Sequence, residues 1–330
     1  MTHRFSDPPS PRTAEGAPRR VGVEIEYAKL DVQQSADLVQ SLFGGEQKPD
    51  GLHRITVAGT RDGDFLVELD LRLLHREIRD DKPDDDEVQR ILNDLDRELT
   101  KAAGDVAGLL VPCEIACPPI AYPELGAIED LIVALRHKGA IGTSSSLLAA
   151  FGLQLNVELA SLETPDILRQ FRAYLLLSDW LREEIGVNIK RRLATFIDPF
   201  PSRYVERVVD PAYKPDLGQL IDDYIDANPT RYKEFDLLPL FAHLDKERVR
   251  AQLPKAKINP RPTFHYRLPD SRIDDPAWSL AEEWERWLVV ERVAADPDIL
   301  GRLQDAYLEY RSHLVPLGWA ERVRRILRAL

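Results

Sequence analysis

Two carboxylates at one end of the chain have the clearest potential for chemistry. Glu24 and Glu26 are separated by one apolar residue, and residues 21–27 alternate apolar with polar or small side chains. A β-strand here would place both carboxylates on one face and its large apolar side chains on the other. Neighbouring carboxylates repel each other unless water or a cation intervenes, and such oxygen pairs are typical ligands of Mg²⁺ or Mn²⁺. A solvated strand face gives the same pattern, and for one isolated Glu-x-Glu that interpretation is favoured.

The same alternation recurs in other segments. This recurrence favours a metal-binding site over a merely solvated strand face. Each segment has an apolar face and a polar face, as expected for a half-buried antiparallel strand. The segments and their polar residues are 65–71 with Glu68 and Asp70, 111–116 with Glu114, 152–159 with Gln154, Asn156 and Glu158, and 263–268 with His265 and Arg267. With residues 21–27, they predict one amphipathic sheet whose polar face is rich in Glu and ends with His and Arg.

Composition predicts a soluble, cytoplasmic protein with a substantial core. The chain has 330 residues, 44% of them hydrophobic, which is enough for one large catalytic unit or two smaller domains. The net charge of −12 argues against a general nucleic-acid binder. Cys113 and Cys117 lack the partners of a zinc site, so they are predicted to pack in the core. No apolar run is long enough to cross a bilayer. Residues 1–19 are rich in Pro, Ser, Arg and Thr, which predicts a disordered lead rather than a signal peptide.

Helices are predicted between and after these strands, with residues 20–330 forming a single domain. Residues 160–260 and 270–330 are expected to be largely helical. Thr164 followed by Pro165 indicates the start of a long helix that ends near Gly186. Further helical spacing is found at 32–42, 84–99, 125–135, from 216 onward, at 279–288, and from 299 and 320. The acidic run at 84–86 is interpreted as helix capping, and the tryptophans as core residues.

Several motifs, in their order along the chain, resemble the bacterial putative amidoligase family. This family belongs to the carboxylate–amine ligase group related to glutamine synthetase and glutamate–cysteine ligase. The segments that carry the resemblance are 22–26 (GVEIE), 112–119 (PCEIACPP), 150–156 (AFGLQLN) and 261–267 (RPTFHYR), supported by 198–201 (DPFP), 228–231 (NPTR) and 237–241 (LLPLF). It extends from about residue 20 to the C-terminus.

The resemblance implies an α+β fold with a glutamine-synthetase-like curved antiparallel sheet that binds ATP and Mg²⁺ or Mn²⁺. It implies an ATP-dependent carboxylate–amine ligase that forms an amide or peptide-like bond through an acyl phosphate. The substrates would be small-molecule or peptide carboxylates and amines, with a glutamine amidotransferase as a candidate partner and neither nucleic acid nor membrane involved. The implied metal ligands are Glu24, Glu26, Glu114 and Glu68, the implied catalytic residues are Arg267 and His265, and the implied nucleotide-binding residues are Gln154 and Asn156. Arg261 and Arg231, which flank motif-like segments, and Arg191 are further expected nucleotide-binding residues.

Two positions depart from the family pattern and leave alternatives open. Gln154 precedes Asn156 where the family typically has His-x-His or His-x-Asn, and glutamine is a poorer metal ligand than imidazole. His265 stands where the wider superfamily usually has Glu. A catalytically weakened nucleotide- or peptide-binding member of the same fold is therefore the alternative. An interaction module with a merely solvated sheet face is a third hypothesis. Arg191 lies in a basic run that more often marks a solvated face.

Overall fold

The computed structural model describes residues 5–51, 53–69, 112–143, 151–186, 199–229, 233–313 and 318–328. The chain divides into two compact units. Unit 1 comprises residues 1–20, 157–269 and 280–330, and unit 2 comprises residues 21–156 and 270–279. The predicted helix at 84–99 lies outside the described residues. No helix in the described ranges is both long enough and apolar enough to span a bilayer.

Unit 2 is built on an antiparallel sheet. Its strand order is β2-β3-β4-β5-β1-β7, and β6 also pairs with β1. The strands are β1 (Arg20–Tyr27), β2 (Glu46–Pro49), β3 (Arg54–Thr60), β4 (Gly63–Leu69), β5 (Cys113–Ala116), β6 (Ile120–Ala121) and β7 (Leu153–Glu158). Strands β1, β4, β5 and β7 confirm predicted segments. Strands β2 and β3 were not predicted, since β2 has few apolar side chains and β3 contains Gly59.

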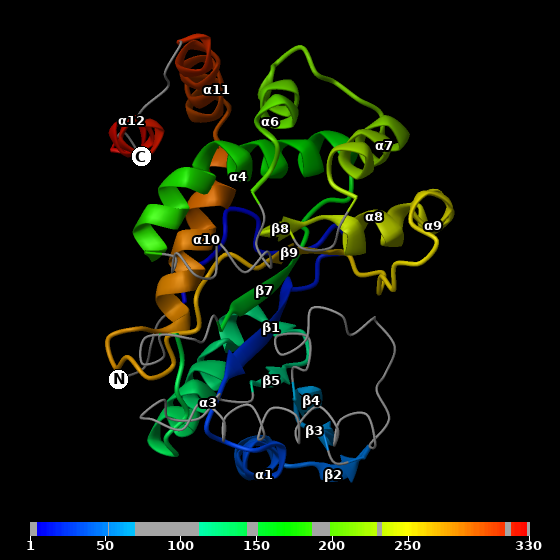
Figure 1. The fold of residues 1–330 in the computed structure, drawn as a ribbon, viewed down its shortest axis with the longest axis vertical. Helices are drawn as coiled ribbons and strands as arrows, with labels where there is room; N and C mark the ends of the chain where they lie inside the picture. Colours follow the sequence, from blue (N-terminus) through cyan, green and yellow to red (C-terminus); the bar gives the residue numbers. More distant parts are fainter. Residues whose placement is uncertain are drawn as a thin grey trace, which may run out of the picture. The chain divides into compact units, whose positions relative to one another are not determined.

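One face of this sheet forms the core of unit 2, as the alternation predicts. Val23, Ile25 and Tyr27 of β1 are all fully buried. Helix α1 (Val32–Phe43) packs against β2, β3, β4 and α3 (Gly126–His137), and the short 3₁₀ helix η2 (Tyr122–Glu124) precedes α3 (Figure 1). The ring of Phe43 lies 4.5 Å from that of Phe65 on β4. The cysteines belong to the same interior.

The N-terminus of α1 shows why the chain turns into a helix there. The Asp31 carboxylate accepts a hydrogen bond from the backbone N–H of Gln34, and the Gln34 side chain accepts one from the backbone N–H of Asp31. This reciprocal capping satisfies two amide groups that a helix N-terminus otherwise leaves without partners.

Unit 1 is mainly helical and contains the last strands in the order of the sheet. After the last residues of β7 come β9 (Thr263–Tyr266) and then β8 (Phe235–Asp236), which pair antiparallel. The helices are α4 (Thr164–Ile185), α6 (Ser202–Val209), α7 (Leu217–Ala227), α8 (Leu238–Leu244), α9 (Lys246–Gln252), α10 (Leu280–Ala295), α11 (Pro297–Ser312) and α12 (Trp319–Leu327). The fold class is therefore α+β with antiparallel strands and a helical C-terminal part.

Helix α4 is the centre of unit 1 and follows its sequence signals closely. It begins with Pro165 in its first turn and ends before Gly186, which adopts the left-handed conformation that favours glycine. It contacts α6, α10, α11 and α12 (Figure 1). Trp284 and Trp287 of α10 are almost completely buried, which confirms their prediction as core residues.

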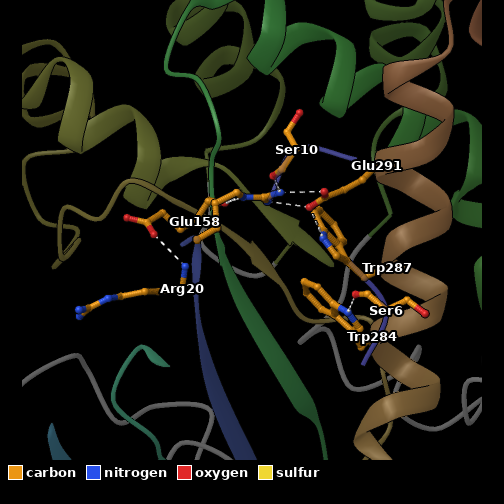
Figure 2. A network of polar contacts seen from close by, with 8 residues as sticks. Ser6, Ser10, Arg20, Glu158, Trp284, Trp287 and Glu291 are labelled. Atoms are coloured by element: carbon orange, nitrogen blue, oxygen red, sulfur yellow. Dashed lines mark hydrogen bonds and ion pairs between the residues drawn. The ribbon is translucent and has the colours of Figure 1, made fainter. Parts of the chain in front are cut away.

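The N-terminal segment, predicted to be a disordered lead, is placed against unit 1 from residue 5 onward. The Trp284 indole N–H donates to the Ser6 carbonyl (Figure 2). The Ser6 backbone N–H donates to the Glu285 carboxylate. Arg19 is 3% exposed and forms an ion pair with Glu291 at 2.7 Å. Composition predicts disorder for this segment because it is polar. The structure instead shows specific long-range hydrogen bonds that hold it.

Residues 270–279, which were expected to be helical, form no helix. They belong to unit 2, where the backbone N–H of Thr143 donates to the Ser271 carbonyl at 2.9 Å. Arg136 of α3 also donates to the carbonyls of Ile273 and Trp278. These contacts use backbone carbonyls that a helix would have engaged, and α10 begins only at Leu280.

Candidate active-site groups

A row of three carboxylates crosses the sheet of unit 2. Glu26 of β1 is directly opposite Glu114 of β5, and Glu114 is directly opposite Glu68 of β4. Residues directly opposite each other on antiparallel strands project their side chains from the same face. Glu24 lies two residues from Glu26 and shares that face. Glu26 and Glu114 are 8% and 4% exposed, so like charges are held close together with little access to water.

Two buried amide side chains of β7 bind the carboxylates of β1. The Gln154 side chain donates to Glu26 Oε1 at 3.1 Å, and the backbone N–H of Gly152 donates to Glu26 Oε2 at 2.6 Å. Asn156 Nδ2 donates to Glu24 Oε1 at 2.8 Å. Gln154 therefore acts here as a hydrogen-bond donor that holds Glu26 in place.

Asn156 also has a buried oxygen without a hydrogen-bond partner. Its side-chain oxygen Oδ1 is inaccessible to water and accepts no hydrogen bond, although the residue is only 4% exposed. An unsatisfied buried acceptor is rare in native proteins and has a cost. Gly22 makes room for this side chain, since a Cβ added there would lie 3.3 Å from the Asn156 Cβ.

Glu68 is engaged by a basic residue of its own. Arg54 on β3 is directly opposite Glu68, and its Nε and Nη2 approach Glu68 Oε2 at 2.8 and 2.5 Å. Both side chains are 21% exposed. This ion pair engages one oxygen of Glu68, and Glu68 is also less buried than Glu26 and Glu114.

The donor atoms of this face suit a hard cation. In the described parts of the chain, no three His, Cys, Asp or Glu side chains are grouped closely enough to hold a metal ion. Mg²⁺ at nucleotide sites, however, is usually bound by one or two carboxylates together with substrate phosphates and water. A pair from the carboxylates of Glu24, Glu26 and Glu114, together with the unsatisfied oxygen of Asn156, provides such a set.

A second polar group lies in unit 1, at the end of β9. Arg267 Nη2 lies 3.1 Å from His265 Nδ1 and 3.4 Å from Asp236 Oδ2. Asp236 of β8 is directly opposite His265 and is fully buried. Its other oxygen accepts a hydrogen bond from the backbone N–H of Leu238 at 2.9 Å.

This arrangement fixes which His265 nitrogen can carry a proton. Arginine has only donors, so in this contact Nδ1 of His265 must accept and the ring proton must reside on Nε2. The carboxylate of Asp236 compensates the positive charge of Arg267. Together they can present a planar cation and an imidazole N–H, which are suitable donors for phosphate or carboxylate oxygens.

The backbone beneath Arg267 is held by a buried ion pair. The backbone N–H of Arg267 donates to the Glu234 carbonyl at 2.9 Å, and the Glu234 carboxylate binds Arg182 of α4 at 2.6 Å. Burial raises the pKa of the Glu234 carboxyl, and the charge of Arg182 opposes that rise. The strand end that carries Arg267 is thereby tied to the central helix of unit 1.

The remaining predicted residues are not part of this group, and one important residue was missed. Arg261 has an exposed side chain in the loop before β9, and its backbone N–H donates to the Pro239 carbonyl. Arg191 and Arg231 lie outside the described residues. Asp236 was not predicted, because β8 has only two residues and gives no periodic signal. The alternation of Glu234 and Asp236 with Phe235 is the only sequence hint.

Comparison with known proteins gives one family match. The sequence model of the family described as "Putative amidoligase enzyme" matches residues 17–289, which is most of the chain. The match includes every strand of the described residues and both polar groups. No curated protein and no solved structure matches the chain. The expected likeness to glutamine synthetase therefore remains a prediction.

Proposed function

The chain belongs to the putative amidoligase enzyme family, and from this premise we propose that it is an ATP-dependent carboxylate–amine ligase. A carboxylate oxygen of the substrate attacks the γ-phosphorus of ATP, and ADP leaves. The amine nitrogen then attacks the carbonyl carbon of the acyl phosphate, phosphate leaves, and the nitrogen loses a proton as the amide bond forms. The observation that carries the proposal is the buried pair of opposed carboxylates, Glu26 and Glu114, on a sheet face held by amide side chains.

The acidic face of unit 2 is proposed to hold Mg²⁺ or Mn²⁺ that accompanies ATP. The cation would neutralise triphosphate charge. Two of the carboxylates of Glu24, Glu26 and Glu114, together with the oxygen of Asn156, are its proposed ligands. Gln154 is proposed to fix the orientation of Glu26 through its hydrogen bond. Cation binding would relieve the repulsion between opposed carboxylates and satisfy the oxygen of Asn156.

The group in unit 1 is proposed to contact phosphate oxygens. The guanidinium of Arg267 keeps its charge and has planar donors that match these oxygens better than an ammonium does. Asp236 is proposed as a positioning residue, because it binds Arg267 from a fully buried position. His265, with its proton on Nε2, supplies one further N–H donor. Such donors stabilise charge that develops on a transferring phosphoryl group.

A catalytically weakened nucleotide-binding protein is the second candidate function. Two observations favour it. Gln154 uses its amide to hold Glu26, and Glu68 is engaged by Arg54. This candidate predicts binding of Mg²⁺-ATP without amide-bond formation.

The discriminating experiment measures ATP binding and ADP release on the same preparation. ADP release that requires both a carboxylate and an amine from a substrate panel supports the ligase. The variant Glu114→Gln should lose that release, whereas Glu68→Gln should retain most of it. Saturable Mg²⁺-ATP binding with no ADP release from any pair supports the weakened member. Absence of both binding and turnover contradicts the two candidates together.

A further inference from the structure

Unit 1 contains a cavity of about 110 Å³ that is separate from the group around Arg267. Its walls come from the N-terminal segment, the residues that follow β7, the first turns of α4, strand β9 and the end of α10. Its lining includes Leu159, Asp166, Arg169, Gln170, Phe264 and Ala294. Phe264 lines the cavity, and alternation along β9 directs His265 to the opposite face.

The inner wall is apolar and neutral. Leu159, Phe264 and Ala294 are 6%, 1% and 4% exposed. The nearby charges of Arg19 and Glu291 neutralise each other through two contacts, at 2.8 and 2.7 Å. Arg19 also donates to the carbonyls of Glu158 and Ser10.

The Glu291 side of this wall is held by further hydrogen bonds. Glu291 accepts a hydrogen bond from the Trp287 indole at 2.7 Å (Figure 2). Arg19 and Glu291 therefore bind each other and neighbouring groups of the wall. They are not available to bind a charged ligand.

The outer wall carries one positive and one negative side chain, and these form a partly exposed ion pair. Asp166 and Arg169, one turn apart on α4, form an ion pair at 2.5 Å, and their side chains are 32% and 49% exposed. An exposed pair of this kind contributes little to stability, so a ligand can exchange with it at low cost. Beside it, the side-chain oxygen of Gln170 is buried and accepts no hydrogen bond.

These features match a small zwitterion. A simple anion would be repelled by Asp166, and a simple cation by Arg169. A molecule with both charges can place its carboxylate on the guanidinium fork of Arg169 and its ammonium on Asp166. For comparison, an apolar cavity of about 150 Å³ is known to accommodate benzene. The present cavity is smaller, but it opens beside the exposed residues Ser10, Arg169 and Ala295.

We propose that this cavity binds a free α-amino acid with a small side chain, such as glycine or L-alanine. Its carboxylate would bind Arg169, its ammonium would bind Asp166, with the oxygen of Gln170 as a further acceptor nearby, and its side chain would face Leu159 and Ala294. The inference is independent of the proposed ligase activity, because binding can be measured without ATP or metal.

The test is a calorimetric titration of the full chain with L-alanine, N-acetyl-L-alanine and L-alanine methyl ester. Saturable binding is expected for L-alanine. About tenfold weaker binding or less is expected for each derivative, since each lacks one charge and loses a charge-assisted contact. Absence of saturable binding by L-alanine or glycine at millimolar concentrations would overturn the proposal. Equal binding of either derivative would overturn the assignment of a zwitterion.

Variants locate the site. Arg169→Gln and Asp166→Asn should each weaken L-alanine binding by about tenfold or more. Ala295→Leu should block the opening and also weaken it. The matched control is Arg207→Gln, because Arg207 forms another ion pair of unit 1, with Asp223, and is also 49% exposed but does not line the cavity. Equal effects of Arg169→Gln and Arg207→Gln would place the binding site elsewhere.

Discussion

At the residue scale, the most specific feature is the contact of Arg267 with both His265 and Asp236. Replacing Arg267 by Lys keeps the charge but removes the planar donors, so ATP turnover should fall by about tenfold or more while the fold is retained. ADP formation and thermal melting of the same variant provide the measurement. Normal turnover with a lowered melting temperature would instead make Arg267 a structural ion-pair partner of Asp236.

The tautomer of His265 provides a test of Asp236 that needs no substrate. If Asp236 holds Arg267 against His265, the native protein should show one neutral tautomer, with the proton on Nε2. Asp236→Asn should give mixed tautomers, since Arg267 loses the charged partner that holds it. Nitrogen chemical shifts of the histidines, with His265→Gln used for assignment, report this directly. An unchanged tautomer in the variant would remove Asp236 from the positioning role.

The acidic residues make a separate prediction about metal binding. Mg²⁺ or Mn²⁺ should raise the melting temperature, because an ion bound only by the folded state stabilises that state. The double variant Glu24→Gln with Glu26→Gln should abolish this increase. Glu68→Gln is the control that should leave most of it, because Arg54 already engages Glu68. An unchanged metal response in the double variant would place the ion elsewhere.

At the element scale, the N-terminal segment is joined to α10 by a buried ion pair. Arg19→Met would leave Glu291 charged and buried at 2% exposure, which should cost about 3–5 kcal/mol of unfolding free energy. Arg169→Met removes an exposed ion pair and should cost no more than about 1 kcal/mol. Denaturant unfolding of both variants gives the comparison. Similar small losses would mean that the segment contributes little to the stability of unit 1.

At the scale of the whole molecule, the buried thiols predict how stability responds to alkaline pH. Burial raises the pKa of the Cys113 thiol to about 11 and also raises the pKa of Cys117. Above about pH 9 the unfolded chain loses thiol protons that the folded chain retains, so rising pH favours unfolding. Each thiol should lower stability by about 1.4 kcal/mol per pH unit in this window. Melting temperatures of the native protein and of a Cys113→Ala, Cys117→Ala variant between pH 8 and 10 measure the difference, and equal slopes would exclude the thiols as its source.

The sequence by itself determined the local structure and the family. Alternation placed Glu24 and Glu26 opposite the buried Val23 and Ile25, because strand periodicity is a property of neighbouring residues. Likewise Thr164, Pro165 and Gly186 marked the ends of α4, since capping depends on local backbone chemistry.

Only the tertiary structure decided which distant residues meet. Strand register placed Glu26 opposite Glu114 and Arg54 opposite Glu68. A shift of the pairing by one residue would have changed every partner. Asp236 lies in a two-residue strand with no periodicity of its own, so its contact with Arg267 required the neighbouring strand. The N-terminal segment is ordered by Arg19 and Glu291, which are 272 residues apart. Such contacts depend on the folded chain bringing remote segments together, and no local pattern records them.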